Sequence, residues 1–293
     1  MDSVTINRVF AFRLKDYAQL TKMRLASLVV FSAAMTYLLG TSFPIDWAKF
    51  LWLIAGGFLI TGSSNAFNQI MERELDRLME RTSNRPLPDY RMSLTEAYTI
   101  ALFTGLSGQI ILFYFVNPTC GILGTIALFS YVFAYTPLKR FTPFAVFVGA
   151  IPGAIPTALG YIAATGEISF AALILFAIQF FWQFPHFWAI AWVADDDYKK
   201  AGFELLPTRK RDKASAFQTM IYAFALIPVG LMPYLFKLSG FYSMIVLMLA
   251  AAWFIWKAVV LYRECSIDAA RKLMFASFVY LPVVLIALVL DRV

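Results

Sequence analysis

The chain has 293 residues, of which 60% are hydrophobic and only 15% are charged, and its mean hydropathy is +0.69. A water-soluble domain carries about a quarter charged residues, so this composition excludes a soluble protein and indicates a membrane protein. One membrane crossing takes about 20 apolar residues, which leaves no room for a large soluble domain. We therefore expect residues 1–293 to form a single polytopic, all-α domain.

The chain begins with a basic segment. Residues 1–24 contain five Lys and Arg side chains, with no apolar run before the first predicted span and no small-residue cleavage signal, so we expect the N-terminus to be retained. Apolar and basic residues alternate between Val9 and Leu20, which is typical of a short helix in the membrane interface. The two cysteines, Cys120 and Cys265, are far apart in sequence and predict no disulfide framework.

Nine nearly uncharged runs follow, and we interpret each as a helix that crosses the membrane. Two boundaries are placed at the turn signals Asn117-Pro118 and Thr165-Gly166-Glu167, because the uncharged runs there are too long for one helix. The pattern predicts a bundle around a central cavity that opens to the cytoplasmic side. The predicted spans are residues 25–40, 49–69, 96–116, 119–136, 143–164, 169–193, 215–236, 240–261 and 273–290.

The distribution of basic residues predicts the orientation of this bundle. With the N-terminus in the cytoplasm, every Lys and Arg except Lys49, Lys237 and Arg292 falls on the cytoplasmic side, as the positive-inside rule requires. The C-terminus is then periplasmic, and we expect a bacterial inner (plasma) membrane. The net charge of +7 is explained by this orientation and indicates no nucleic-acid partner.

The polar chemistry gathers on the same side, first at the end of the second span. Asn68, Glu72 and Asp76 are spaced four residues apart, which places three oxygen-bearing side chains on one face of a helix. Two carboxylates stacked in this way at the mouth of an apolar bundle repel each other unless a cation lies between them. Mg²⁺ is the natural candidate, because it prefers carboxylate and amide oxygens and shares its shell with substrate phosphates.

A stripe of arginines runs beside the acidic stripe, on a helix that we expect to continue until Pro86 disfavours it. Guanidinium groups match phosphate oxygens, so carboxylates with a metal on one face and arginines on the next describe a diphosphate site. An ordinary amphipathic helix with internal ion pairs has the same pattern, and this segment alone does not separate the two interpretations. The arginines are Arg73, Arg77, Arg81 and Arg85.

A second acidic cluster follows the sixth span, where Asp195, Asp196 and Asp197 are consecutive. We place them at the C-terminal end of that helix, where the helix dipole disfavours negative charge, and this placement suggests a compensating ligand. Facing each other across the bundle mouth, the two acidic clusters would hold Mg²⁺ and a diphosphate. Lys139 and Arg140, after the fourth span, add cations at the same depth.

The only histidine lies deeper in the sixth span. His186 is about 13 Å from Asp195 along the helix axis, and a polar group at this depth is a functional candidate. An imidazole among aromatic residues would ligate a haem iron, donate to a substrate or bond to another helix, and the residue type does not decide between these roles. Pro152 and Pro156 in the fifth span would open a cavity wall or let helices pack closely.

Five segments together resemble the protohaem IX farnesyltransferases, the haem O synthase branch of the UbiA-type intramembrane prenyltransferase superfamily. The Asn-x3-acid-x3-Asp pattern is shared across the superfamily, whereas the Arg-Thr-x2-Arg-Pro and Trp-Gln-x-Pro-His-Phe segments narrow the resemblance to the haem branch. The segments are Asn68 to Asp76 with Arg81-Thr82-x2-Arg85-Pro86, then Tyr135 to Arg140, Gly149 to Pro156, Trp182 to Phe187 and Asp197 to Pro207.

The resemblance implies that farnesyl diphosphate, haem B and water give haem O and diphosphate. It implies that Asn68, Glu72 and Asp76 hold Mg²⁺ together with Asp195 or Asp197, and that His186 contacts haem. Glu72 stands where the family commonly has Asp, and Lys199 falls four residues after Asp195, where other branches have a second Asp. The residues that we expect to bind the diphosphate or the haem are Arg77, Arg81, Arg85, Tyr135, Lys139, Arg140, His186, Asp196, Tyr198 and Lys199.

Three other functions compete with this interpretation. A prenyltransferase for a quinone precursor or another aromatic acceptor would share the acidic motifs but would not need His186. A transporter would have ionisable groups near the midplane, whereas here they gather at one interface. A haem-bearing electron carrier usually needs a second strong axial ligand, and only methionine is available. Expected partners are the lipid bilayer and haem A synthase or oxidase assembly proteins.

Overall fold

The computed structural model describes residues 13–293, and these residues are helical apart from turns and one isolated bridge between Ser239 and Arg292. Within them, nine helical stretches are long and apolar enough to cross a membrane, so the nine predicted spans are confirmed. Their elements are α2 (Met23–Gly40), α3 (Trp47–Asp76), α4 (Leu94–Ile110), η1 (Ile111–Val116), α5 (Pro118–Phe129), η2 (Ser130–Tyr135), α6 (Thr136–Leu138), α7 (Ala145–Thr165), α8 (Phe170–Val193), α9 (Asp195–Lys200), α10 (Lys213–Phe224), α11 (Leu226–Leu235), α12 (Phe241–Glu264) and α13 (Ile267–Leu290).

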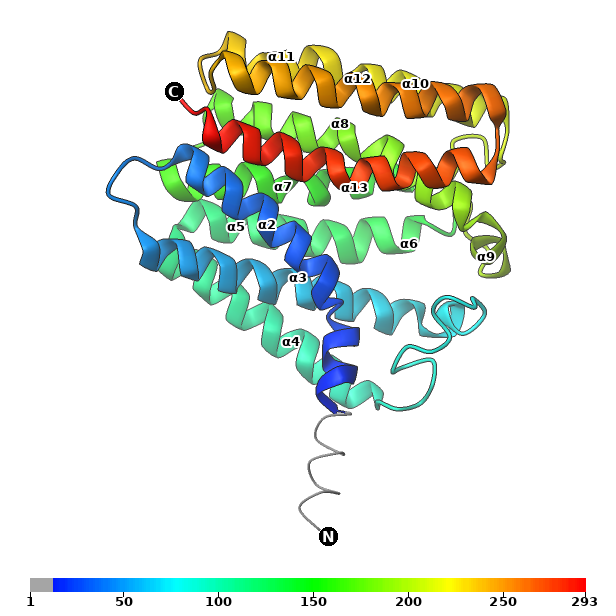
Figure 1. The fold of residues 1–293 in the computed structure, drawn as a ribbon. Helices are drawn as coiled ribbons and strands as arrows, with labels where there is room; N and C mark the ends of the chain where they lie inside the picture. Colours follow the sequence, from blue (N-terminus) through cyan, green and yellow to red (C-terminus); the bar gives the residue numbers. More distant parts are fainter. Residues whose placement is uncertain (1–12) are drawn as a thin grey trace, which may run out of the picture.

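The spans form a ring whose first and last members touch. α2 packs on α3 and α7, α3 on α4, α7 on α8, and α8 on α13, which in turn contacts α2. Figure 1 shows α10, α11 and α12 along one side of the bundle and α3 and α4 along the other, with α2, α7, α8 and α13 between them. α9 lies at the end of the bundle where α6 ends; we call this the polar end.

α7 lies inside the bundle and is the most buried of the nine spans. Small residues allow this, because membrane helices approach closely where side chains are short. At Gly160 the approach is extreme: an added Cβ would lie 2.0 Å from the Ala33 carbonyl oxygen of α2. The outward faces of the other helices carry exposed apolar side chains such as Leu106 and Leu249, as expected for contact with lipid.

Two span boundaries differ from the sequence prediction by six residues or more. α3 continues to Asp76 rather than ending near residue 69, so the acidic stripe belongs to one unbroken helix. α13 begins at Ile267 rather than residue 273, because Asp268 and Lys272 pair at 2.7 Å on its first turns while both remain exposed. Charged residues thus extend both helices beyond their apolar runs.

The N-terminal segment packs against the start of α4. Residues 13–20 are helical; Arg13 pairs with Glu96 at 2.8 Å, and Asp16 pairs with Arg91. Lys22 then takes a left-handed conformation, with φ of 49°, before α2 begins. The predicted interfacial helix is therefore helical over the part that the structure describes, and residues 1–12 of that prediction lie outside it.

At the opposite end of the bundle, the C-terminus is fastened to neighbouring spans. Asp291 accepts a hydrogen bond from the Ser243 amide of α12 at 2.7 Å. The Arg292 guanidinium donates to the carbonyl oxygens of Leu38 and Thr41 at the end of α2 and lies 4.9 Å from the centre of the Phe43 ring. The seam between the first and last spans is thus pinned at this end.

Candidate active site

The predicted acidic stripe is present on α3, and all three of its side chains are buried. Asn68, Glu72 and Asp76 are only 2%, 5% and 1% exposed, although two of them are carboxylates near the end of a membrane span. A buried carboxylate is strongly destabilised unless it is paired. The neighbours of this stripe therefore determine how the site is built.

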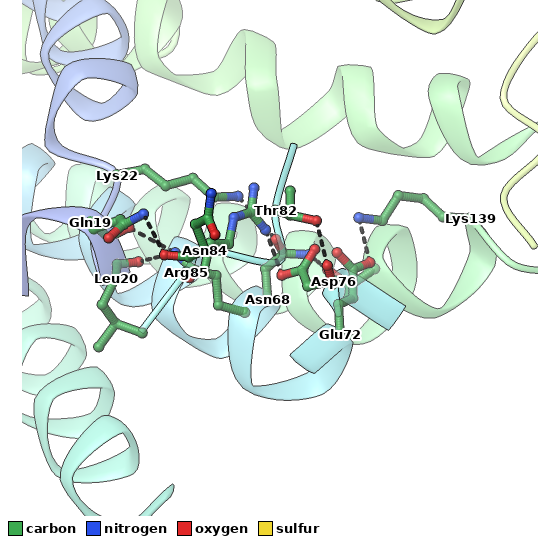
Figure 2. Close-up of polar contacts among 12 residues, drawn as sticks. Gln19, Leu20, Lys22, Asn68, Glu72, Asp76, Thr82, Asn84, Arg85 and Lys139 are labelled. Atoms are coloured by element: carbon green, nitrogen blue, oxygen red, sulfur yellow. Dashed lines mark hydrogen bonds and ion pairs between the residues drawn. The ribbon is translucent and has the colours of Figure 1, made fainter. Parts of the chain in front are cut away.

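Each member of the stripe has a cationic partner from another part of the chain (Figure 2). The Lys139 ammonium pairs with Glu72, and Arg85 donates to Asp76 Oδ2 at 2.5 Å. Lys22 donates to Asn68 Oδ1 at 3.1 Å. Three cations thus converge on one amide and two carboxylates at the end of a membrane span.

Lys22 was not predicted as a site residue. It precedes α2 and enters the site only because the left-handed turn there points it at α3. Burial, together with the nearby positive charges of Arg85 and Lys139, lowers its pKa to about 7. The signal in the sequence is a basic residue directly before the first apolar run, which we assigned to membrane orientation.

Lys139 is held more firmly in its charged form. Burial is the largest influence and acts to lower its pKa, but the Glu72 carboxylate together with Tyr131 and Tyr198 outweighs burial, and the pKa of Lys139 is raised. Its ammonium also lies 5.0 Å from the centre of the Tyr135 ring and 5.3 Å from that of Phe203. Arg140, by contrast, is exposed at the rim.

The prediction that the arginine stripe is helical as far as Arg85 is wrong. α3 ends at Asp76, and the chain turns back because the Thr82 hydroxyl donates to the Asp76 carbonyl at 2.8 Å while Arg85 reaches the Asp76 carboxylate. Arg77 is engaged in the loop, pairing with Glu74 at 2.8 Å and lying over the Tyr90 ring.

The placement of the second acidic cluster at a helix C-terminus is also wrong. α8 ends at Val193, and residues 195–200 form the separate short helix α9. The three aspartates lie in its first turn, where the helix dipole favours negative charge, so the dipole gives no reason to infer a compensating ligand.

Asp197 joins the two acidic regions of the polar end. Its carboxylate accepts hydrogen bonds from the backbone amides of Glu80 and Arg81, both at 3.1 Å. Partial burial acts in the other direction, but the bonds from Arg81, Lys200 and Glu80 lower the pKa of Asp197. The Arg81 guanidinium also lies 5.7 Å from the centre of the Tyr198 ring. α9 is therefore docked on the turn that follows α3.

The other two aspartates of α9 pair with cations on their own side. Asp195 is paired with Lys199 at 2.7 Å and with Arg211 at 3.6 Å, and Asp196 with Arg211 at 3.0 Å. Within residues 13–293, no three His, Cys, Asp or Glu side chains are grouped closely enough to share a metal ion. A metal shared between the two acidic regions therefore stays a prediction.

The donor set on α3 nevertheless suits Mg²⁺. Asn68, Glu72 and Asp76 offer only oxygen ligands, on one stripe, with two negative charges, and hard cations prefer this chemistry. The three cations that neutralise the stripe, Lys22, Arg85 and Lys139, are all on long, flexible side chains. Replacing them by a metal ion requires side-chain movement rather than a rearrangement of helices.

An apolar cavity of about 270 Å³ lies beneath the polar stripe. Its walls come from α2, α3, α5, α7, α8 and α13, and Asn65, one turn before Asn68, is among its lining residues. Pro152 and Pro156 of α7 line it too. The π-helical turn η2 contributes Tyr131 and Tyr135, and π turns often mark functional sites.

His186 lines the same cavity. Its Nδ1 lies 2.7 Å from Ser277 Oγ, and that hydroxyl donates its single proton to the Met274 carbonyl at 2.5 Å. Nδ1 must therefore carry the imidazole proton and donate to Ser277, which leaves Nε2 with a lone pair. The ring stacks on Trp182 with centres 4.5 Å apart.

Within residues 13–293, nine helices of membrane-spanning length surround a cavity that is capped by buried carboxylates and cations, which is the architecture of a membrane-embedded transferase. Residues 28–280 match the model of the UbiA prenyltransferase family, and the chain belongs to this family. Protohaem IX farnesyltransferases are its similar relatives. That of Cytophaga hutchinsonii is 48% identical over 97% of this chain and 99% of its own length, and that of Christiangramia forsetii is 47% identical over 100% and 98%.

Solved structures have the same fold at much lower identity. A digeranylgeranylglyceryl phosphate synthase matches with a TM-score of 0.80 at 21% identity, over 95% of this chain and 98% of that one. A UbiA homologue from Archaeoglobus fulgidus, bound to GPP and Mg²⁺, matches with a TM-score of 0.65 at 14% identity, over 93% and 99%. The prediction of an all-α, nine-span fold of this superfamily is confirmed.

Proposed function

We propose that this protein transfers the farnesyl group of farnesyl diphosphate to a vinyl group of haem B and, with water, yields haem O and diphosphate. Full-length similarity to two bacterial protohaem IX farnesyltransferases supports this function. One structural observation carries the chemistry: a buried stripe of Asn68, Glu72 and Asp76, matched by three cations, caps an apolar cavity that His186 lines.

The polar stripe works by exchange of ionic partners. In the structure, Lys139 and Arg85 neutralise Glu72 and Asp76. With a diphosphate and Mg²⁺ bound, the carboxylates of Glu72 and Asp76 would hold the metal and the cations would face the phosphate oxygens, so every buried charge would stay compensated. Asn68, Glu72 and Asp76 would hold the ion, with Asp195 as a further ligand from α9, while Asp197 would hold α9 against the turn after α3. Bound Mg²⁺ stabilises the charge of the leaving diphosphate.

Lys22, Arg85 and Lys139 are the cations best placed for the diphosphate, because they already meet at the stripe. Desolvated cations bind phosphate more strongly than exposed ones. The remaining predicted binding residues lie toward the rim or on α9: Arg77, Arg81, Arg140, Asp196, Tyr198 and Lys199. The cationic members of this set would steer the anionic substrate or contact haem propionates.

The cavity supplies the environment for the allylic cation that forms as the C–O bond breaks. Its apolar walls exclude bulk water and so protect the cation from premature hydrolysis. The rings of Tyr131 and Tyr135 line it on the side of the polar stripe, and aromatic faces attract positive charge. The terminal carbon of the haem vinyl group then attacks the farnesyl cation.

His186 is our choice for contact with haem. It lines the cavity as a neutral ring, with Nδ1–H held by Ser277, and no described residue hydrogen-bonds its Nε2. We assign the protein to a bacterial inner membrane, with the N-terminus cytoplasmic and the C-terminus periplasmic. Haem O would then pass to haem A synthase or to oxidase assembly proteins.

The test is direct. Purified protein is incubated with haem B, farnesyl diphosphate and Mg²⁺, and haem O is sought by mass spectrometry. Asp76→Ala should give no product, whereas Asp268→Asn, which alters an exposed carboxylate paired with Lys272 on the first turns of α13, should be as active as the wild type. A parallel reaction offers an aromatic quinone precursor instead of haem. Product from that acceptor alone would overturn the haem assignment.

A further inference from the structure

α8 presents two glutamines to the cavity. Gln179 and Gln183 are 5% and 2% exposed, both line the cavity together with His186, and they lie about 6 Å apart along the helix axis. Neither side chain has a role in the diphosphate chemistry at the polar end. Two buried amides inside a membrane are costly unless something uses them.

The NH₂ groups of both amides are held by backbone carbonyls. Gln179 Nε2 donates to the Gly153 carbonyl at 3.1 Å, and Gln183 Nε2 donates to those of Ala150 at 3.1 Å and Gln179 at 3.2 Å. Only the NH₂ group can face a carbonyl oxygen, so these contacts fix which way each amide points. Packing of α8 on α7 therefore accounts for the amide NH₂ groups of the two glutamines but not for their amide oxygens.

Both amide oxygens lack a hydrogen-bond partner within the described chain. Gln179 Oε1 is buried without any hydrogen-bond partner. Gln183 Oε1 accepts no hydrogen bond within the described chain and lies over Gly153, where an added Cβ would be 2.0 Å away. With the lone pair of His186 Nε2, α8 therefore carries three acceptors without a partner in the described chain, on side chains that line this part of the cavity.

Acceptors of this kind require a ligand that donates hydrogen bonds. The farnesyl chain and the haem vinyl group have no such donors, whereas water has two and is a substrate of the proposed reaction. We propose that the amide oxygens of Gln179 and Gln183 accept one O–H bond of the water molecule that becomes the hydroxyl group of haem O, and that His186 Nε2 accepts the other O–H bond and receives its proton. This inference rests on the proposed function and adds two positioning residues to it.

The step balances as follows. The vinyl π electrons form the bond between the terminal vinyl carbon and farnesyl C1, which leaves the inner vinyl carbon positively charged. A lone pair of the bound water forms the C–O bond, an O–H bond breaks with its electrons kept by oxygen, and the proton moves to Nε2. This proton then leaves the site together with the released diphosphate. A protonated alcohol is so acidic that a weak base suffices.

Without an oriented water, the same cation is neutralised differently. It loses a proton from the new CH₂ group and gives an alkenyl haem that is lighter than haem O by one water molecule. The ratio of hydroxylated to dehydrated product therefore reports on the water site, independently of the rate of farnesyl transfer. A purely structural role of the glutamines would change the total yield and not this ratio.

The experiment compares Gln179→Leu, Gln183→Leu and the double variant with the wild type, using haem B, farnesyl diphosphate and Mg²⁺ in water labelled with oxygen-18. We expect labelled haem O from the wild type and a ratio at least tenfold lower in the double variant. Gln109→Leu is the matched control, since Gln109 Oε1 is also buried without a partner but does not line the cavity; its ratio should equal that of the wild type.

An unchanged ratio in a folded, farnesylating double variant would overturn the inference and leave the proposed function intact. No farnesylated haem from the wild type would instead contradict the proposed function itself. If the leucine variants do not fold, Gly153→Ala replaces them, because its Cβ displaces the Gln183 amide while keeping every polar group. A wild-type ratio in that variant would equally overturn the inference.

Discussion

α3 caps the cavity with polar side chains and α8 carries polar side chains in the cavity wall, but the two sets are paired in opposite ways. On α3, Glu72 and Asp76 are charged and each has a partner of opposite sign. On α8, Gln179 and Gln183 are neutral, and their oxygens have none. Unpairing a buried charge costs about 3–5 kcal/mol, against about 1–3 kcal/mol for a neutral acceptor. The buried carboxylates of α3 therefore need partners of opposite charge, whereas the amide oxygens of α8 can remain without a partner until a ligand binds.

Removal of Mg²⁺ is expected to have the largest effect on activity and almost none on stability. Chelation with EDTA should lower farnesyl transfer by about 10³-fold or more, because metal stabilisation of the leaving group is worth several kcal/mol. Glu72 and Asp76 are already paired with Lys139 and Arg85, so the unfolding temperature in detergent should move by less than about 2 °C. A large drop in the unfolding temperature on chelation would contradict the view that ion pairs, rather than the metal, stabilise the buried carboxylates.

Asp76→Asn removes one charge of the α3 stripe with almost no change in shape. We expect kcat/KM to fall by about 10²–10³-fold, the usual loss for one group that stabilises developing charge. Steady-state formation of haem O measures it. Activity within about tenfold of the wild type would remove Asp76 from the metal site.

Lys139→Met sharpens the comparison through stability. It leaves Glu72 buried without a partner, and we expect a loss of about 3–5 kcal/mol. Adding Glu72→Gln removes the stranded charge, so the double variant should recover most of that stability while remaining inactive. Thermal unfolding of the four proteins of this cycle gives the coupling. Additive single effects would show that the two residues do not act as a pair.

Asp197→Ala should have the smallest effect, because Asp197 holds α9 to the turn after α3 rather than lining the cavity. We expect a rise of about tenfold in KM for farnesyl diphosphate, as for outer residues that orient a metal site, with little change in kcat.

The lowered pKa of Asp197 means that its docking contribution is complete above the ordinary Asp value of about 3.9 and is lost only as the pH falls through the lower folded-state pKa. Between pH 5 and 8 the variant and wild-type KM should therefore differ by a constant factor; a difference that changes with pH in this range would contradict the assignment.

Features encoded locally in the sequence were predictable. The spans follow from runs of apolar residues, and the burial of Asn68, Glu72 and Asp76 on one face follows from four-residue spacing within a continuous helix. The predicted boundaries failed where charged residues extend a helix, as at the start of α13. Local periodicity thus determines which side chains share a face but leaves helix ends less certain.

Features that depend on distant contacts were missed. α3 stops at Asp76 because Thr82 and Arg85 return to it, and a turn of this kind has no periodic signature. A break at Ala194 places Asp195 to Asp197 at the start of α9 instead of the end of α8, which reverses the sign of the dipole argument. Lys22 comes to Asn68 across 46 positions of sequence. Assigning such partners requires the fold.

The clasp formed by Arg292 also limits how the bundle moves. Because this guanidinium grips the α2 terminus at Leu38 and Thr41, the first and last helices share a fixed pivot on the side away from the charged stripe. Separation of α2 from α13 would therefore be smallest at this end of the bundle and largest at the polar end. Loosening the pivot would let the whole seam part in parallel and expose the cavity to lipid along its full height.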